Sequence, residues 1–230
     1  MLTACAPSVR PPVLPPLGVE TPEDFPEQNY QAQSLPAPGK VFRIDAQLSE
    51  LRILVYRGGE LARFGHNHVV TSTDIQGFVL RAEDVLASRF DLFLPADRLV
   101  VDDPLVRAEE GADFSSTVSD KDSDGTRANM LGDKVLDVAQ FPFLQLSGKL
   151  VAANESELTL DVNVTIHGAT KAVQTVANMR ETSTNLTVEG AFNVRQTDFG
   201  IEPFSALLGR LRVEDEVTVK YRIFAGAINN

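Results

Sequence analysis

Cysteine, histidine and basic residues are scarce in this chain. Its 230 residues include one cysteine, three histidines, and 21 Lys and Arg against 32 Asp and Glu, which gives a formal net charge of −11. The lone Cys5 excludes an internal disulfide and a metal cage built from thiolates. Because no cluster of basic residues offsets the negative charge, we expect no binding to nucleic acid and no basic patch that holds an anionic membrane.

Several motifs are also missing. No apolar run approaches the roughly 18 residues that a membrane-spanning helix needs. There is no nucleophile elbow of the form G-x-S-x-G, no Gly-rich phosphate loop and no dinucleotide fingerprint. The sequence therefore offers no motif for serine hydrolase chemistry or for nucleotide binding.

The first 38 residues differ in composition from the rest. Residues 2–5 read LTAC, an order that resembles the bacterial lipobox, in which Cys5 would become the lipid anchor. Residues 6–38 hold nine of the thirteen prolines, which remove backbone donors and favour extended chain. We predict a disordered, Pro-rich linker over residues 1–38 and a folded domain over residues 39–228. A chance match of four residues, followed by an ordinary disordered tail, is the alternative.

The folded domain is predicted to be all-β. Apolar residues alternate with polar ones from Leu158 to Ile166, the period of a strand that covers a core or a lumen. Similar alternation recurs over residues 50–56, 88–94, 185–196 and 212–224. Eight or more such strands fit an antiparallel barrel, because closure removes exposed edges. An open sandwich is the alternative architecture.

One helical insertion interrupts the strands. The sequence predicts a helix over Thr126 to Asp137, capped by Asp124 or Thr126. The preceding residues 120–125 read DKDSDG, like the first half of an EF-hand calcium loop, but the loop's final acidic ligand is replaced by Leu131. We therefore expect a solvated acidic loop there.

The histidines are the candidate metal ligands. His66 and His68 are two residues apart, and would face the same way on a strand, while His167 lies at a predicted hairpin turn. Three imidazoles could hold a metal with one open position, as in zinc enzymes. Polar contacts at a pocket mouth, or a hydrogen-bonded structural pair, explain the same residues.

An ordered set of short segments resembles the YceI-like family of bacterial secreted or periplasmic proteins. The set spans roughly residues 40–225. It consists of FRID at residues 42–45, the histidine-containing turn, TRANML at 126–131 before Phe141 and Pro142, the LTL…HGATK segment within residues 158–173, and RQTDFGI at 195–201. The acidic stretch over residues 102–125 and the doubled histidine depart from the family pattern and suggest a subgroup.

The resemblance implies an antiparallel eight-stranded, elongated, lipocalin-like barrel with a short α-helical insertion. It also implies a non-catalytic protein without cofactor, which binds, sequesters or transports a polyisoprenoid, a prenyl quinone or a similar amphiphile in its lumen. The residues expected to line that lumen or its mouth are Leu51, Ile53, Val55, His66, His68, Phe90, Leu92, Leu94, Leu160, Val162, Val164, His167, Phe192, Val219 and Tyr221. The alternatives are a metal-binding protein or metal-dependent enzyme that uses the three histidines, and a solid β module that binds another protein.

The lipobox and the family together predict a periplasmic lipoprotein of the bacterial cell envelope, in contact with membrane only through Cys5. A homodimer is compatible with this interpretation. Alternation alone does not distinguish a hollow barrel from one that its own side chains fill.

Overall fold

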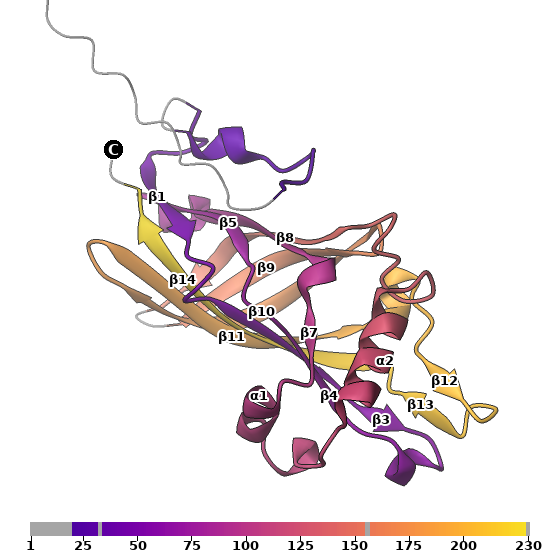
Figure 1. Cartoon of the computed structure of the whole chain (residues 1–230). Helices are drawn as coiled ribbons and strands as arrows, with labels where there is room; N and C mark the ends of the chain where they lie inside the picture. The colour runs from indigo at the N-terminus through magenta and orange to yellow at the C-terminus, as the bar shows by residue number, and fades with distance from the viewer. Residues whose placement is uncertain (1–19, 32–33, 155–156, 229–230) are drawn as a thin grey trace, which may run out of the picture.

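The computed structural model describes residues 20–31, 34–154 and 157–228. Within them, eight antiparallel strands form a ring in the order β1-β5-β6-β8-β9-β10-β11-β14, and pairing of β14 with β1 closes it (Figure 1). The strands are β1 Gly39–Ile44, β5 Gln76–Ala82, β6 Arg89–Pro95, β8 Phe143–Ala153, β9 Glu157–Ile166, β10 Ala169–Glu181, β11 Asn185–Arg195 and β14 Glu216–Ala227. The predicted eight-stranded antiparallel barrel is confirmed.

Strand β14 changes partner along its length. Its last residues, 225–227, pair with β1, whereas residues 218–222 pair with β2 Glu50–Val55. Two further strands, β4 His68–Ser72 and β7 Val100–Val101, extend the sheet from β2. Ser49 lies where the partner changes: its hydroxyl donates to the carbonyl oxygen of Phe224 at 3.2 Å and accepts from the amide of Phe224 at 3.0 Å. The barrel is therefore closed at one end and splays into a wider sheet at the other.

The chain after β7 covers the splayed end. Helices α1 Pro104–Glu109 and α2 Asp120–Leu131 follow β7, and α2 packs beside it (Figure 1). Met130 and Leu131 of α2, with Leu136 beyond it, pack into the main core. This segment supplies the apolar contacts that the open edge of the sheet lacks.

The boundaries of the predicted helix were wrong. Helix α2 begins at Asp120, six residues earlier than expected, and Ser119 caps it by accepting from the amide of Asp122. The acidic residues predicted to form a loop lie in the first turns, where negative charge interacts favourably with the positive end of the helix dipole. The resemblance to a calcium loop is thus not realised in the structure.

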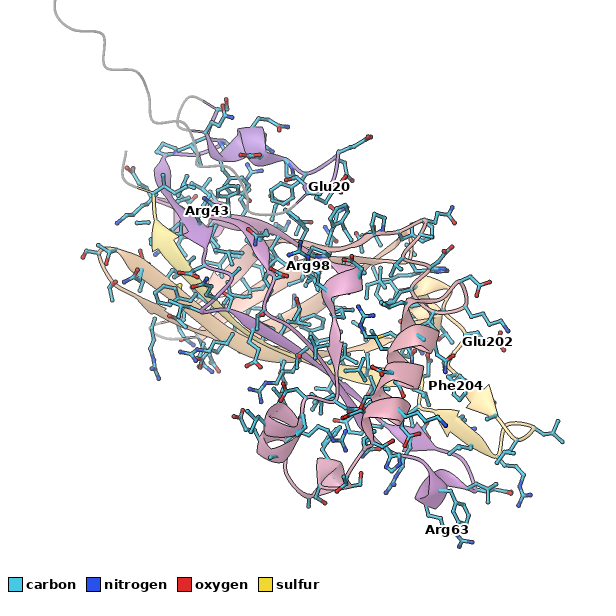
Figure 2. The ribbon with its side chains drawn as sticks, viewed as in Figure 1. Glu20, Arg43, Arg63, Arg98, Glu202 and Phe204 are labelled. Atoms are coloured by element: carbon cyan, nitrogen blue, oxygen red, sulfur yellow. The ribbon has the colours of Figure 1, made fainter. Side chains whose placement is uncertain are left out.

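A small second sheet projects from the splayed end. It contains β12 Ser205–Ala206, β13 Leu211–Val213 and β3 Arg57–Gly58. Figure 2 shows Arg63 and Phe204 at this extremity, remote from Arg43. Short 3₁₀ turns connect the elements: η1 Glu27–Tyr30, η2 Ala62–Phe64, η3 Val85–Ala87, η4 Ala96–Arg98, η5 Ala112–Phe114 and η6 Gln196–Phe199. No helix in the described ranges has the length and apolar character to cross a bilayer.

The described part of the predicted linker is ordered against the barrel. Phe25 and Tyr30 are 6% and 1% exposed, and they pack on an apolar patch on the outer face of the wall, formed with Phe78 and Phe93. The rings of Tyr30 and Phe78 stack with centroids 5.3 Å apart. This segment therefore differs from the disordered chain that its prolines suggested, because a partner surface far along the sequence buries its aromatic residues. Cys5, which the sequence analysis predicts to be the lipid anchor, lies outside the described residues.

Candidate functional site: an apolar cavity in the closed half of the barrel

The inward faces of all eight ring strands enclose a cavity of about 270 Å³. Its wall is mainly aliphatic, with Leu158, Leu160 and Val162 of β9 on one side and Leu186 and Val188 of β11 on another. Burial of apolar chain against such a wall is the dominant source of affinity in dry pockets. The barrel is thus hollow in the half that β1 closes.

Six of the residues expected in the lumen line this cavity: Phe90, Leu92, Leu160, Val162, Phe192 and Tyr221. Six others pack in the main core and do not line it: Leu51, Ile53, Val55, Leu94, Val164 and Val219. Leu51, Ile53 and Val55 lie along β2, which joins the wall at the splayed end, and Leu94, Val164 and Val219 lie on ring strands. The structure therefore divides the predicted lumen into a hollow half and a filled half.

Two glycines give the aromatic rings room inside the wall. A Cβ atom on Gly148 would lie 2.5 Å from a ring carbon of Phe90, which covers this position from the neighbouring strand. A Cβ atom on Gly190 would lie 2.4 Å from the hydroxyl oxygen of Tyr221. Since neither distance is tolerable, glycine at these positions determines where the two rings sit in the cavity wall.

The hydroxyl of Tyr221 is the buried side-chain polar atom that has no hydrogen-bond partner among the described residues. Burial raises the pKa of this phenol, and the nearby Thr175 hydroxyl opposes the effect in part. Thr175 itself donates to the carbonyl oxygen of Ala191 at 3.0 Å. At this place in the cavity wall, therefore, the Thr175 hydroxyl is hydrogen-bonded to the backbone and the Tyr221 hydroxyl is not hydrogen-bonded to any described residue.

Two cationic side chains cross the open end of the cavity. Arg81 lies at the end of β5 and Glu181 at the end of β10, four strands apart in either direction around the ring. Nε of Arg81 nevertheless lies 3.1 Å from Oε2 of Glu181, so the ion pair spans the mouth. Lys40 of β1 reaches the carbonyl oxygen of Ser183, in the turn between β10 and β11. Sequence reasoning missed both cations, since no local pattern shows that the ends of these strands face each other.

The three histidines do not line the cavity and do not converge. Nδ1 of His167 lies 3.3 Å from the carbonyl oxygen of Phe199, and its ring packs edge-on against Phe141. The ring centroids of His66 and His68 are 6.5 Å apart. No group of three or more His, Cys, Asp or Glu in the described ranges could hold a metal ion. The hypothesis of a metal site built from these three residues therefore has no support in the geometry.

His68 belongs to a buried ionic network instead. Its Nδ1 lies 2.6 Å from Oδ2 of Asp102, and Nη1 of Arg107 lies 2.5 Å from the other oxygen of the same carboxylate. Burial acts to raise the pKa of Asp102, but the hydrogen bonds from His68, Val69 and Arg107, with the charge of His68, outweigh it and hold the pKa below its usual range. The network links β4 to the start of α1, and its residues do not line the cavity.

The closed ring, the apolar cavity inside one half and the aliphatic inward faces define a barrel of the lipocalin-like class. The family model described as "YceI-like domain" matches residues 42–225, and the chain belongs to the YceI-like family. No curated protein matches the sequence.

Among solved structures, Burkholderia cenocepacia BcnA is similar, with a TM-score of 0.58 at 11% identity, over 79% of this chain and 98% of that chain. A Campylobacter jejuni YCEI protein is similar with a TM-score of 0.43 at 9% identity, over 61% of this chain and 73% of that chain. The likeness to BcnA shows a shared fold.

Proposed function

We propose that the protein binds the apolar chain of an amphiphile in the closed-half cavity, and sequesters or carries it without chemical change. The observation that carries this proposal is the cavity of about 270 Å³ whose wall comes from all eight strands and is mainly aliphatic. Each methylene group buried there contributes about 0.8 kcal/mol, so a stretch of about eight would contribute about 6 kcal/mol before the entropy cost of binding. A polyisoprenoid or a prenyl quinone is the guest that the family suggests.

The first test is the composition of an organic extract of the purified protein, followed by uptake of a prenyl alcohol such as farnesol after delipidation. Mass spectrometry should show a stoichiometric lipid, and the delipidated protein should regain a guest. An extract without lipid, together with no uptake of farnesol, would contradict the proposal.

A matched pair of variants tests whether the guest binds in the cavity. Val188 of β11 lines it, so Val188→Phe should fill part of the space and weaken farnesol uptake about tenfold or more. Val176 of β10 is 53% exposed and does not line the cavity, so Val176→Phe should leave uptake unchanged. Equal uptake by the two variants would place the guest elsewhere.

We further propose a cell-envelope location through lipid attachment at Cys5. The support is the LTAC order and the Pro-rich stretch after it. With a lipoprotein signal sequence fused before Leu2, the protein should fractionate with bacterial membrane, and Cys5→Ser should release it. Identical fractionation of the two proteins would refute the anchor.

A further inference from the structure

The wall of the cavity differs in charge from the rest of the molecule. The chain carries a net charge of −11, yet the charged residues that line the cavity are Arg81 and Arg89, and none of the described Asp and Glu side chains lines it. On β6, Arg89 pairs with Leu80 and Lys149, and Leu80 packs on the outer apolar patch, so the Arg89 side chain faces outward. Arg81 is therefore the cation on the inner face of the wall.

Arg81 has hydrogen-bond capacity to spare. Its Nε donates to Glu181 at 3.1 Å, and its Nη1 donates to the carbonyl oxygen of Ala82 at 2.9 Å. A guanidinium carries five N–H donors in a planar fork, so three remain unused by the described residues. The Arg81 side chain is 24% exposed, which leaves these donors within reach of a group at the mouth.

The existing partner of Arg81 is easy to replace. The Glu181 side chain is 32% exposed, and ion pairs at such exposure contribute little to stability because water solvates both charges. A carboxylate or phosphate on a guest whose chain is buried in the cavity would be held at the mouth, and would compete with Glu181 from a fixed position. The amino group of Lys40, at the same opening, adds a second cation.

On the basis of the proposed lipid-binding function, we propose that Arg81 is the head-group receptor of this barrel. The cavity takes amphiphiles whose apolar chain ends in an anionic head, a carboxylate or a phosphate. The head binds the guanidinium of Arg81 at the mouth and takes the place of Glu181, while the chain occupies the aliphatic interior. Arg81 thereby selects the class of guest by charge, and the cavity wall selects its chain.

The test measures dissociation constants for two pairs of lipids that share a chain and differ in the head: oleate with oleyl alcohol, and farnesyl phosphate with farnesol. At neutral pH the delipidated wild-type protein should bind each anionic lipid about tenfold more tightly than its alcohol, the preference expected for one charge-assisted contact. The two pairs separate carboxylate from phosphate selectivity.

Variants at the mouth make the test specific. Arg81→Gln should bind oleate and oleyl alcohol equally, with alcohol affinity as in the wild type, and Arg81→Lys should retain part of the preference for oleate. Glu181→Gln should strengthen the preference, since it removes the competing carboxylate. Arg180→Gln, next to Glu181 but exposed on the opposite face of β10, is the control and should change nothing.

The outcomes separate the two proposals. If the wild-type protein binds each alcohol as tightly as its anion, the head-group assignment is overturned while binding in the cavity stands. If none of the four lipids binds, the proposed function itself fails. Loss of alcohol binding in a folded Arg81→Gln protein would also overturn the assignment. Arg81 would then maintain the shape of the cavity rather than bind the head group of the guest.

Discussion

Nδ1 of His68 lies 2.6 Å from Oδ2 of Asp102, in a pair whose carboxylate is fully buried and is shared with Arg107. The pair links β4 to the start of α1, since Asp102 directly precedes the N-cap residue Asp103. Removing the charge of Asp102 would leave the buried guanidinium of Arg107 without its counter-ion. This relationship leads to two measurable consequences.

Asp102→Asn should lower the free energy of unfolding by about 3 kcal/mol, the usual cost of breaking one side of a buried ion pair. Urea denaturation followed by circular dichroism measures the change. Asp97→Asn is the control, because Asp97 is exposed, and it should shift stability by less than about 0.5 kcal/mol. Equal effects of the two substitutions would show that the network contributes no stability.

The same carboxyl should make stability depend on acid pH. The pKa of Asp102 is lower in the folded state than in the unfolded chain, so its contribution is present above the usual aspartate pKa of about 4 and is lost as pH falls through the folded value. Unfolding free energies measured from neutral pH down through this range should fall more steeply for the wild-type protein than for Asp102→Asn. Parallel curves would contradict the assignment.

Asp91 should have the opposite effect. Burial raises the pKa of this carboxyl, which accepts a hydrogen bond from Tyr30 at 2.6 Å. A raised folded pKa means that Asp91 costs stability once pH rises through the usual aspartate range. Asp91→Asn keeps an acceptor for Tyr30 and should therefore stabilise the protein at neutral pH, by up to about 1 kcal/mol given partial screening by solvent.

The gain from Asp91→Asn should shrink as pH falls and vanish by about pH 3, where the carboxyl is largely neutral in both states. Paired denaturation curves at neutral and at acid pH test this difference directly. A gain that is independent of pH would mean that the carboxylate is not penalised by burial.

Ser49→Ala should loosen the junction where β14 changes partner. The substitution leaves the partly buried amide of Phe224 without the Ser49 acceptor, which costs about 1 kcal/mol. Thermal denaturation gives the measurement, and Ser147→Ala, on a half-buried position of β8, is the comparison. Hydrogen exchange at Phe224 should also accelerate, and unchanged exchange there would argue against the role of Ser49.

Gly148→Ala should be poorly tolerated although alanine is small. The added methyl group would lie 2.5 Å from the ring of Phe90 and 2.7 Å from the carbonyl oxygen of Asp161, so one of them must move. We expect a loss of about 1–3 kcal/mol in unfolding free energy. Gly125→Ala, in a helix with open space around that residue, should be neutral or stabilising.

The sequence was most informative where structure is local. The alternation from Leu158 to Ile166 matches β9 almost residue for residue, because one face of that strand contacts the interior along its whole length. Helix α2 was misplaced because none of its residues is fully buried, so no apolar stripe marks its start. Its beginning was encoded in the Ser119 cap and in the acidic first turn, which resembled a calcium loop.

The candidate site was only partly predictable for a different reason. Phe90 and Leu94 lie on the same face of β6, yet Phe90 lines the cavity and Leu94 packs in the filled half. Whether an inward side chain lines the cavity or packs in the filled half depends on the side chains that the opposite strands place at the same height in the barrel. The sequence of one strand does not show which side chains those are. The ion pair between Arg81 and Glu181 depends on ring closure in the same way.

The filled half of the barrel makes the cavity a dead end. Under the proposed function, a guest would enter and leave through the one open end, so its apolar chain would enter first and its head group would leave first. A receiving membrane or enzyme would therefore contact the polar head group before any of the apolar chain is exposed to solvent. Release of the guest would then require its chain to slide out of the cavity along its length, and a longer buried chain would dissociate more slowly.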